Sequence, residues 1–129
     1  DRKKTKPQLK RILDKYFSEW VRRRYADSNG NVKCYTCGWT GPWKKIQNGH
    51  LISRYYLSTR FDPDNCRPQC YVCNMIRNGM TPDFSSNLDR ELGEGTTARL
   101  YKKAQQTMTD YPYEEEIEYY KAKLKTLTE

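Results

Sequence analysis

Cys34-Tyr-Thr-Cys37-Gly38 opens a stretch that continues through Asn48-Gly49-His50 and ends with Cys70-Tyr-Val-Cys73-Asn74. Each Cys-x-x-Cys pair brings two thiolates to one side of a tight loop, and two such pairs supply the four ligands of a tetrahedral zinc ion. Gly38 suits a zinc knuckle, where a positive φ lets backbone N–H groups approach the sulfurs. Four thiolates leave no open coordination position, so we expect these cysteines to bind a structural Zn²⁺.

Other uses of the cysteines remain open from the sequence. Two disulfides would use the same four residues, but no secretory signal opens the chain, so we expect the reducing cytoplasm, where disulfides are rare. The fifth cysteine, Cys66, could form a competing ligand pair with Cys70, and His50 could be a ligand in a three-cysteine site. A buried free thiol is the simpler account of Cys66.

His50 is the only histidine of the chain and lies between the two cysteine pairs. The glycine before it lets a partner approach closely. Asn65 and Asn74 follow where a small ββα finger would turn back towards the histidine. A neutral imidazole can act as a general base at physiological pH, so His50 is our candidate catalytic residue.

His50, Asn65 and Asn74 inside this cysteine frame resemble the HNH, or ββα-metal, nuclease superfamily. A closer likeness, over roughly residues 30–120, is to the phage NinG (Rap) recombination proteins. Its motifs are Gly49-His50-Leu-Ile-Ser-Arg54, Thr59-Arg60-Phe61-Asp62, Asp64-Asn65-Cys66-Arg-Pro-Gln69-Cys70, Cys73-Asn74, Asn78-Gly79 and Glu91-Leu-Gly-Glu-Gly95. The resemblance implies an endonuclease that cuts branched DNA (Holliday junctions, flaps or D-loops) during phage recombination, in the host cytoplasm.

The resemblance also implies a role for each residue of the motif. His50 would be the general base, and Asn65 would pin the loop that carries it through hydrogen bonds to the backbone. Asn74 would bind the catalytic cation, as the asparagine after the last zinc cysteine does in the phage endonuclease VII type of junction resolvase. Oxygen ligands and substrate phosphates suit Mg²⁺ or Mn²⁺.

The chain departs from the superfamily directly before the histidine. Many HNH nucleases carry a cation-binding aspartate there, whereas this chain has Gly49. Side chains alternate between faces in an extended segment, so Asn48 shares a face with the histidine and is the better substitute ligand. Gln47 would face away unless the strand bulges at Gly49. The aspartates at positions 62 and 64 are further alternatives.

The 129 residues carry 24 Lys and Arg against 16 Asp and Glu, a formal net charge of +8. Residues 1–80 hold 17 basic and 6 acidic side chains, a net of +11, whereas residues 81–129 hold 7 and 10, a net of −3. A basic front suggests a bound polyanion such as DNA, although ordinary solvated charge would give the same count. No apolar run approaches the length that crosses a membrane.

The length predicts one domain, residues 1–129, with an α+β fold in three parts. Residues 1–26 should form a basic amphipathic helix from Pro7, with the first six residues frayed, because apolar residues recur every three or four positions. Residues 31–80 should form the zinc-bound HNH core. Residues 81–129 should form C-terminal helices that pack on the first helix or on a second subunit.

Within the core, strands are expected over 32–40 and 44–52, and a helix over 70–77. Trp39 and Trp43 should cover the zinc site, with stacking on bases as the alternative. The later helices are expected over 84–92, over 96–108 with Thr96 as N-cap, and after Pro112.

Five arginines are the candidate DNA contacts. Arg22, Arg23 and Arg24 fall in the last turn of the first helix, where they complement the helix dipole or touch phosphate. Arg54 and Arg60 lie in a loop with two tyrosines. This mixture suits a DNA backbone and unstacked bases, with packing and solvation as the alternative.

A second class of function fits the same features. A non-catalytic zinc-finger DNA-binding or recombination accessory module would use the cysteines and the basic front but give His50 no role. A protein-interaction zinc ribbon fits the acidic tail but not the basic front. Metal-dependent cleavage separates the enzyme from both. Two cuts at a four-way junction favour a homodimer.

Overall fold

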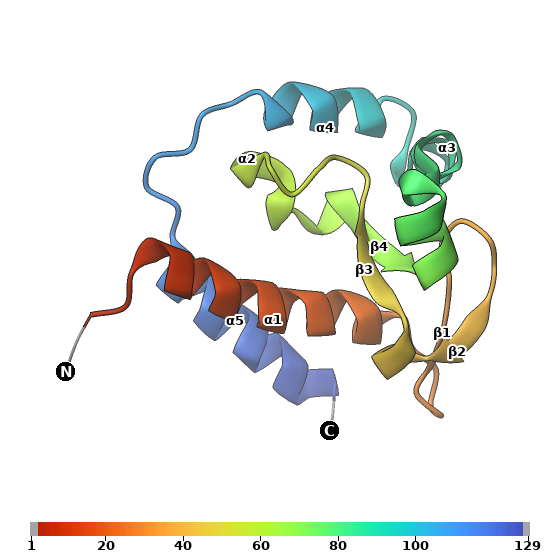
Figure 1. The fold of residues 1–129 in the computed structure, drawn as a ribbon, viewed down its shortest axis with the longest axis horizontal. Helices are drawn as coiled ribbons and strands as arrows, with labels where there is room; N and C mark the ends of the chain where they lie inside the picture. The colour runs from red at the N-terminus through yellow and green to blue at the C-terminus, as the bar shows by residue number, and fades with distance from the viewer. Residues whose placement is uncertain (1–2, 128–129) are drawn as a thin grey trace.

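The computed structural model describes residues 3–127. Two separate antiparallel strand pairs form the sheets. One of these pairs lies between the long N-terminal helix and the two helices within residues 81–104, and the last helix runs beside the N-terminal one (Figure 1). The elements are α1 (Lys6–Arg24), β1 (Asn31–Lys33), β2 (Thr40–Pro42), β3 (Gln47–His50), α2 (Leu57–Arg60), β4 (Cys66–Gln69), a π-turn (Val72–Ile76), α3 (Thr81–Leu92), α4 (Thr96–Ala104) and α5 (Tyr113–Leu127). The predicted α+β class is confirmed, and no helix within residues 3–127 is long and apolar enough to span a bilayer.

α1 begins where the sequence provides a complete N-terminal cap. The Thr5 hydroxyl accepts a hydrogen bond from the Gln8 N–H, and the Gln8 side chain accepts one from the Thr5 N–H. Pro7 occupies the first turn, where no N–H is needed. The helix ends at Arg24, two residues before the predicted position 26. Residues 1 and 2 of the segment predicted to be frayed lie outside the described part of the chain.

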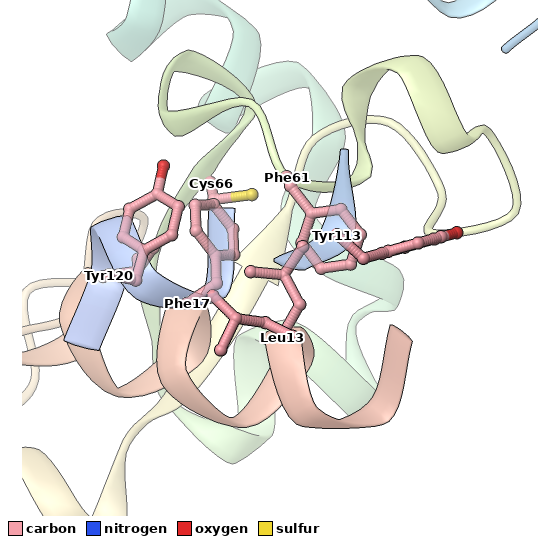
Figure 2. Close-up of a cluster of buried hydrophobic side chains, with 8 residues drawn as sticks. Leu13, Phe17, Phe61, Cys66, Tyr113 and Tyr120 are labelled. Atoms are coloured by element: carbon pink, nitrogen blue, oxygen red, sulfur yellow. The ribbon is translucent and has the colours of Figure 1, made fainter. Parts of the chain in front are cut away.

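α5 lies beside α1 and encloses a core of aromatic side chains (Figures 1 and 2). The ring centroid of Phe17 is 5.0 Å from that of Tyr120 and 5.7 Å from that of Phe61, which directly follows α2. Cys66 is fully buried in the same core, which confirms it as a buried free thiol. The core residues are Leu13, Phe17, Val21, Phe61, Cys66, Tyr113, Ile117 and Tyr120. Of the two arrangements predicted for the last helix, packing on α1 is the one found.

Each cysteine pair belongs to a different hairpin. β1 and β2 pair antiparallel, with Val32 opposite Gly41, and the first pair lies in the turn between them. The prediction of one strand over residues 32–40 is therefore wrong, because the chain reverses at the knuckle, where Gly38 has a φ of +83°. β3 pairs antiparallel with β4, with His50 opposite Cys66, and the second cysteine pair follows β4.

α3 and α4 pack against Leu51 and Ile52, the two residues that follow β3. α3 ends before Gly93, as predicted. α4 starts at Thr96, but its N-cap is Gly95, with a φ of +95°, and the Thr96 hydroxyl instead donates to the Gly93 carbonyl. The predicted Thr96 cap is therefore wrong, and α4 ends four residues before position 108.

A buried cation joins α3 to β4. Arg67 is 2% exposed, and its Nε lies 3.2 Å from a carboxylate oxygen of Glu91. Its Nη1 donates to the carbonyl oxygens of Pro63 and Cys66, and Glu91 also accepts from the Tyr35 hydroxyl at 2.7 Å. A buried guanidinium is tolerated only with such partners, so Glu91 fixes the C-terminal end of α3 on the hairpin.

Gly49, in the middle of β3, has no room for a side chain. A Cβ there would lie 2.1 Å from Oε1 of Gln69. The Gln69 side chain is fully buried, and its Nε2 donates to the Thr36 hydroxyl and to the Gly79 carbonyl at 3.0 and 2.9 Å. It cannot move aside without losing both bonds. Packing therefore explains the glycine that precedes His50.

Gly49→Ala should lower the free energy of unfolding by about 1–3 kcal/mol, the usual cost of an extra carbon in a filled core. Urea denaturation followed by circular dichroism measures it. Gly41→Ala is the control: its Cβ would meet Trp39 at 2.3 Å, but this indole is exposed and can swing into solvent. An equal loss in both variants, or none at Gly49, would contradict the role given to Gln69.

Candidate active site and zinc centre

The four cysteines predicted to bind zinc meet at one point. Their Sγ atoms all lie within 4.8 Å of one another, a spacing at which one tetrahedral ion contacts them all. Cys34 and Cys37 come from the knuckle between β1 and β2, Cys70 follows β4, and Cys73 lies in the π-turn. A zinc ion here would join the turn of the first hairpin to the segment that follows β4.

The competing ligands lie elsewhere. The Cys66 thiol donates to the Arg60 carbonyl, 3.7 Å away, and Nε2 of His50 bonds the same carbonyl at 2.9 Å. All five cysteines are free of disulfides. The four-thiolate set is therefore the ligand set that the fold assembles.

The thiols of this centre differ in acidity. Burial acts to raise the pKa of Cys34, but hydrogen bonds with the backbone of Cys70, Thr36 and Cys37 outweigh it and lower this pKa to about 6. Burial raises the pKa of Cys73 to about 12. Cys34 is therefore a thiolate at neutral pH, whereas a metal that binds must expel the proton of Cys73.

The second cysteine pair runs into a single wide turn instead of the longer helix predicted. The Arg77 N–H donates to the Val72 carbonyl at 2.8 Å, the spacing of a π-turn, and Gly79, with a φ of +86°, ends the segment as expected. Asn74 directly follows Cys73 in this turn. The same piece of backbone therefore carries a zinc ligand and the candidate cation ligand.

A cleft of about 580 Å³ opens between α1, β3 and the π-turn. Its walls are Asp14, Ser18, Arg22, Ile46, Gln47, Asn48, His50, Ser53, Arg54, Asn74 and Met75. The cleft brings together six residues named from the sequence, which are Gln47, Asn48, His50, Asn74, Arg22 and Arg54. The candidate base and the candidate cation ligands therefore face one space.

The Arg60 carbonyl fixes the tautomer of His50. A carbonyl oxygen only accepts, so Nε2 carries the proton and Nδ1 keeps its lone pair. Burial lowers the pKa of His50 below its ordinary value of 6.5, and the charges of Arg54 and Arg60 act in the same direction. These effects outweigh the hydrogen bonds with the backbone of Arg60 and Asn48, which act to raise the pKa of His50. The ring is therefore neutral at physiological pH.

Three amide side chains lie beside the histidine. Nδ2 of Asn74 donates to Oε1 of Gln47 at 2.7 Å, which leaves Oδ1 of Asn74 as an acceptor. Gln47 reaches the cleft although strict alternation would turn it away, because it is the first residue of β3 and its side chain is long. Oδ1 of Asn48 is buried and has no hydrogen-bond partner. An unpaired buried oxygen is costly, and a bound cation would satisfy it.

Asn65 makes the bonds predicted for it. It is fully buried, its Oδ1 accepts from the Ile52 N–H at 2.9 Å, and its Nδ2 donates to the carbonyls of Ile52 and Thr59 at 3.1 Å. These bonds tie together both ends of the loop between β3 and α2. Asn65 therefore holds the segment that follows His50 and does not face the cleft.

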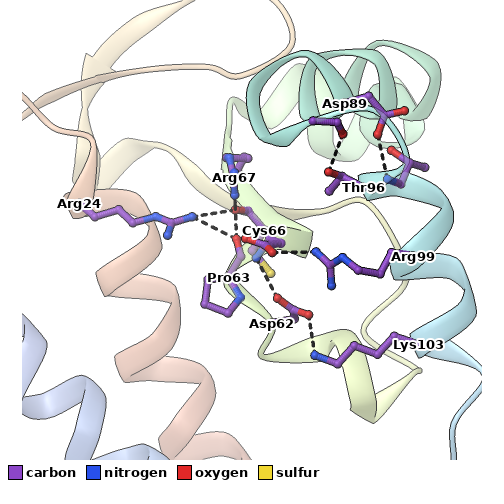
Figure 3. Close-up of polar contacts among 12 residues, drawn as sticks. Arg24, Asp62, Pro63, Cys66, Arg67, Asp89, Thr96, Arg99 and Lys103 are labelled. Atoms are coloured by element: carbon purple, nitrogen blue, oxygen red, sulfur yellow. Dashed lines mark hydrogen bonds and ion pairs between the residues drawn. The ribbon is translucent and has the colours of Figure 1, made fainter.

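The two aspartates considered as cation ligands form ion pairs outside the cleft. Asp62 pairs with Lys103 at 2.6 Å and Asp64 with Arg99 at 2.8 Å, and both cations come from α4 (Figure 3). Neither aspartate lines the cleft. Of the candidates for the second ligand, Asn48 and Gln47 are the ones that line the cleft.

Four of the five predicted DNA-contacting arginines bond within the protein, and these four include Arg24 and Arg60, which do not line the cleft. Nη2 of Arg24 donates to the carbonyls of Pro63 and Cys66 at 3.1 and 3.3 Å (Figure 3). Arg60 forms a two-pronged ion pair with Asp14, and its Nη1 donates to the Arg54 carbonyl. Their donors hold the fold together, so we no longer assign them to DNA.

The remaining three arginines lie at or near the cleft. Arg22 and Arg54 line it directly. Arg23 pairs with Glu19 at 2.9 Å, and the guanidinium groups of Arg22 and Arg23 lie 5.3 and 5.0 Å from the Trp43 ring centroid. The end of α1 therefore places two guanidinium groups against the ring of Trp43.

α1 forms one wall of the cleft, and two of its residues there, Asp14 and Ser18, were not predicted from the sequence. Asp14, Ser18 and Arg22 line the cleft and follow one another at intervals of four residues. This spacing places them on one helix face, beside the buried stripe of Leu13 and Phe17. A polar stripe next to the apolar one was the available signal.

Cys73→Ser should remove bound zinc and much of the folded structure around the two knuckles, because three thiolates cannot close the tetrahedral site. Zinc content per chain and thermal melting by circular dichroism check this. Cys66→Ser is the matched control, since it changes a buried cysteine outside the cluster. Full zinc occupancy and an unchanged melting curve in Cys73→Ser would count against a structural zinc.

Comparison with known proteins gives one match. A family model described as Bacteriophage Lambda NinG protein matches residues 1–129. No curated protein and no solved structure matches the chain. The family match extends the likeness noted in the central motifs to both flanking sets of helices.

Proposed function

The chain belongs to the Bacteriophage Lambda NinG protein family, and from this membership we propose that it is a cation-dependent endonuclease that hydrolyses DNA phosphodiester bonds. The observation that carries the proposal is one cleft lined by His50, Asn48 and Asn74, in which Asn48 also has a buried Oδ1 without a hydrogen-bond partner. A neutral imidazole and two amide oxygens in a cleft with arginines are the parts that such a reaction needs.

His50 is the proposed general base. Its Nε2–H is bonded to a carbonyl, so Nδ1 takes the proton of the attacking water. The carbonyl belongs to Arg60, whose guanidinium is paired with Asp14 of α1. The ion pair therefore holds the base through the backbone of residue 60.

Asn48 and Asn74 are the proposed ligands of the catalytic cation. A Mg²⁺ or Mn²⁺ ion, when bound, supplies positive charge to the scissile phosphate and the leaving 3′ oxygen. Gln47 accepts a hydrogen bond from Nδ2 of Asn74 and so leaves Oδ1 of Asn74 to bind the cation. By family likeness, the products carry 5′-phosphate and 3′-hydroxyl ends.

The glycine before the histidine fits this assignment. A side chain at Gly49 would meet Gln69 on the packed side of the hairpin. In this proposal Asn48, one position earlier, takes the place of the ligand that many HNH nucleases carry directly before the histidine.

Arg22 and Arg54 are the proposed contacts to the phosphate backbone, because both line the cleft. The basic front of the chain would add longer-range attraction. Branched recombination intermediates are the proposed substrates on the strength of the family alone, and the two cuts that resolve a junction favour a homodimer. The competing function is a non-catalytic DNA-binding module.

His50→Ala should reduce cleavage at least about 100-fold, the usual contribution of a general base, and leave DNA affinity and zinc content unchanged. The assay compares matched four-way junction, flap and linear duplex DNA with Mg²⁺, with Mn²⁺ and without a divalent cation. Ser53→Ala, which alters the same cleft, is the control and should cut normally. Absence of cleavage by the wild-type protein on every substrate would support the non-catalytic module instead.

The cleavage rate should fall in acid with an apparent pKa below 6.5, because burial lowers the pKa of His50 from that ordinary value. Only the neutral ring accepts a proton, so the rate rises with pH through this pKa and is level above it. Single-turnover rates across the acid and neutral range measure it. An inflection well above 6.5 that disappears with another residue's substitution would remove His50 as the base.

A further inference from the structure

Apolar side chains are exposed on the outer side of the zinc centre. Trp39, Tyr71 and Val72 are 44%, 56% and 44% exposed. They line one hollow together with Lys45 and Arg77, and Cys37, Cys70 and Cys73 form its floor. We call the Trp39–Tyr71–Val72 surface the aromatic platform. A bound zinc ion would fill the floor and leave these exposed side chains in place.

The Trp39 ring packs against the backbone of β2. The backbone of Gly41 lies against its ring, and a Cβ at that position would come within 2.3 Å of a ring carbon. The backbone N–H of Trp39 also donates a hydrogen bond to Sγ of Cys37 at 3.5 Å. The indole therefore packs on β2 while much of its surface stays open to solvent, and with Tyr71 and Val72 it forms the kind of exposed apolar patch that marks an interaction site.

The charge around the platform points to an anionic partner. Lys45 and Arg77 stand at its edge, and no acidic side chain is among the residues that line the hollow. An exposed aromatic surface beside cations is the arrangement that binds single-stranded nucleic acid, since rings stack on bases while cations hold phosphates.

The platform and the candidate active site share one element, the π-turn. Val72 and Asn74 belong to the same π-turn, and the next residue, Met75, lines the cleft while 58% exposed. One side of this short turn therefore faces the scissile phosphate of the proposed reaction, and the other side carries the platform.

We propose that the aromatic platform stacks an unpaired base of the DNA strand whose phosphate lies in the cleft. This inference rests on the proposed function and adds the feature of the substrate that the site reads, which is a base free of its partner strand. Such bases occur at flaps and branch points, whereas a continuous duplex keeps its bases stacked inside.

The test compares two probes without added divalent cation, a labelled oligothymidylate and an abasic oligomer of the same length. Both carry the same phosphates, so the difference in affinity isolates the bases. The wild-type protein should bind the thymidylate about 5- to 150-fold more tightly, the equivalent of roughly 1–3 kcal/mol for one stacked base. Trp39→Ala should bind both probes alike, and Trp39→Phe should recover part of the difference.

Tyr101→Ala is the matched control, because Tyr101 is also 44% exposed but lies on α4. It should keep the wild-type ratio. Zinc content verifies each variant, and if Trp39→Ala loses zinc, the wild-type comparison of the two probes and Tyr71→Ala still decide. Equal wild-type affinity for both probes overturns the proposal. So does sedimentation that shows a dimer lost in Trp39→Ala with the probe ratio unchanged, since the surface would then join two copies.

The outcomes separate this inference from the proposed function. Neither probe is cut under these conditions, so base-dependent binding can stand even if His50 proves not to be catalytic. Conversely, His50-dependent cleavage with no base-dependent binding would leave the nuclease intact and remove only the platform.

Discussion

The convergence of four sulfurs on one point is the constraint on which the centre of this protein depends. The sulfurs come from the turn between β1 and β2 and from the segment after β4, two sheets that share no strand, and the second segment continues directly into the turn that carries Asn74. The two-stranded sheets are too short to hold such an arrangement alone. A metal at the cysteines would therefore set the position of the Asn74 amide, one residue away, as firmly as it sets the fold.

The opposite wall of the cleft is fixed by different means. α1 is held by its aromatic core with α5, and its polar face then meets β3 across the cleft. The pair between Asp14 and Arg60 links this helix to the end of α2, where the Arg60 carbonyl holds His50. A small domain thus uses a metal centre on one side of its site and an apolar core on the other, each compensating for the modest size of the whole.

Local patterns in the sequence predicted the parts whose causes are local. The cysteine spacing gave the ligand set, the capped apolar stripe gave α1, and the motif likeness gave the bonds of Asn65. The errors arose where distant contacts decide. The knuckle splits the expected strand because it must face the second cysteine pair, and Gly95 replaces Thr96 as cap through its backbone conformation. The partners of Arg24 and Arg60 are carbonyl and carboxylate groups from other elements. Spacing along the chain does not reveal such contacts, so the sequence could not predict them.

The tight contact between Gly49 and Gln69 has a consequence for substitution at either position. The Gln69 side chain joins the first knuckle, through Thr36, to the segment after the π-turn, through Gly79, so it cannot shrink without loosening both. A side chain at position 49 would need a smaller residue at position 69 and another tie between those segments. Substitutions at the two positions are therefore coupled, because a Cβ at position 49 and the full length of Gln69 exclude each other.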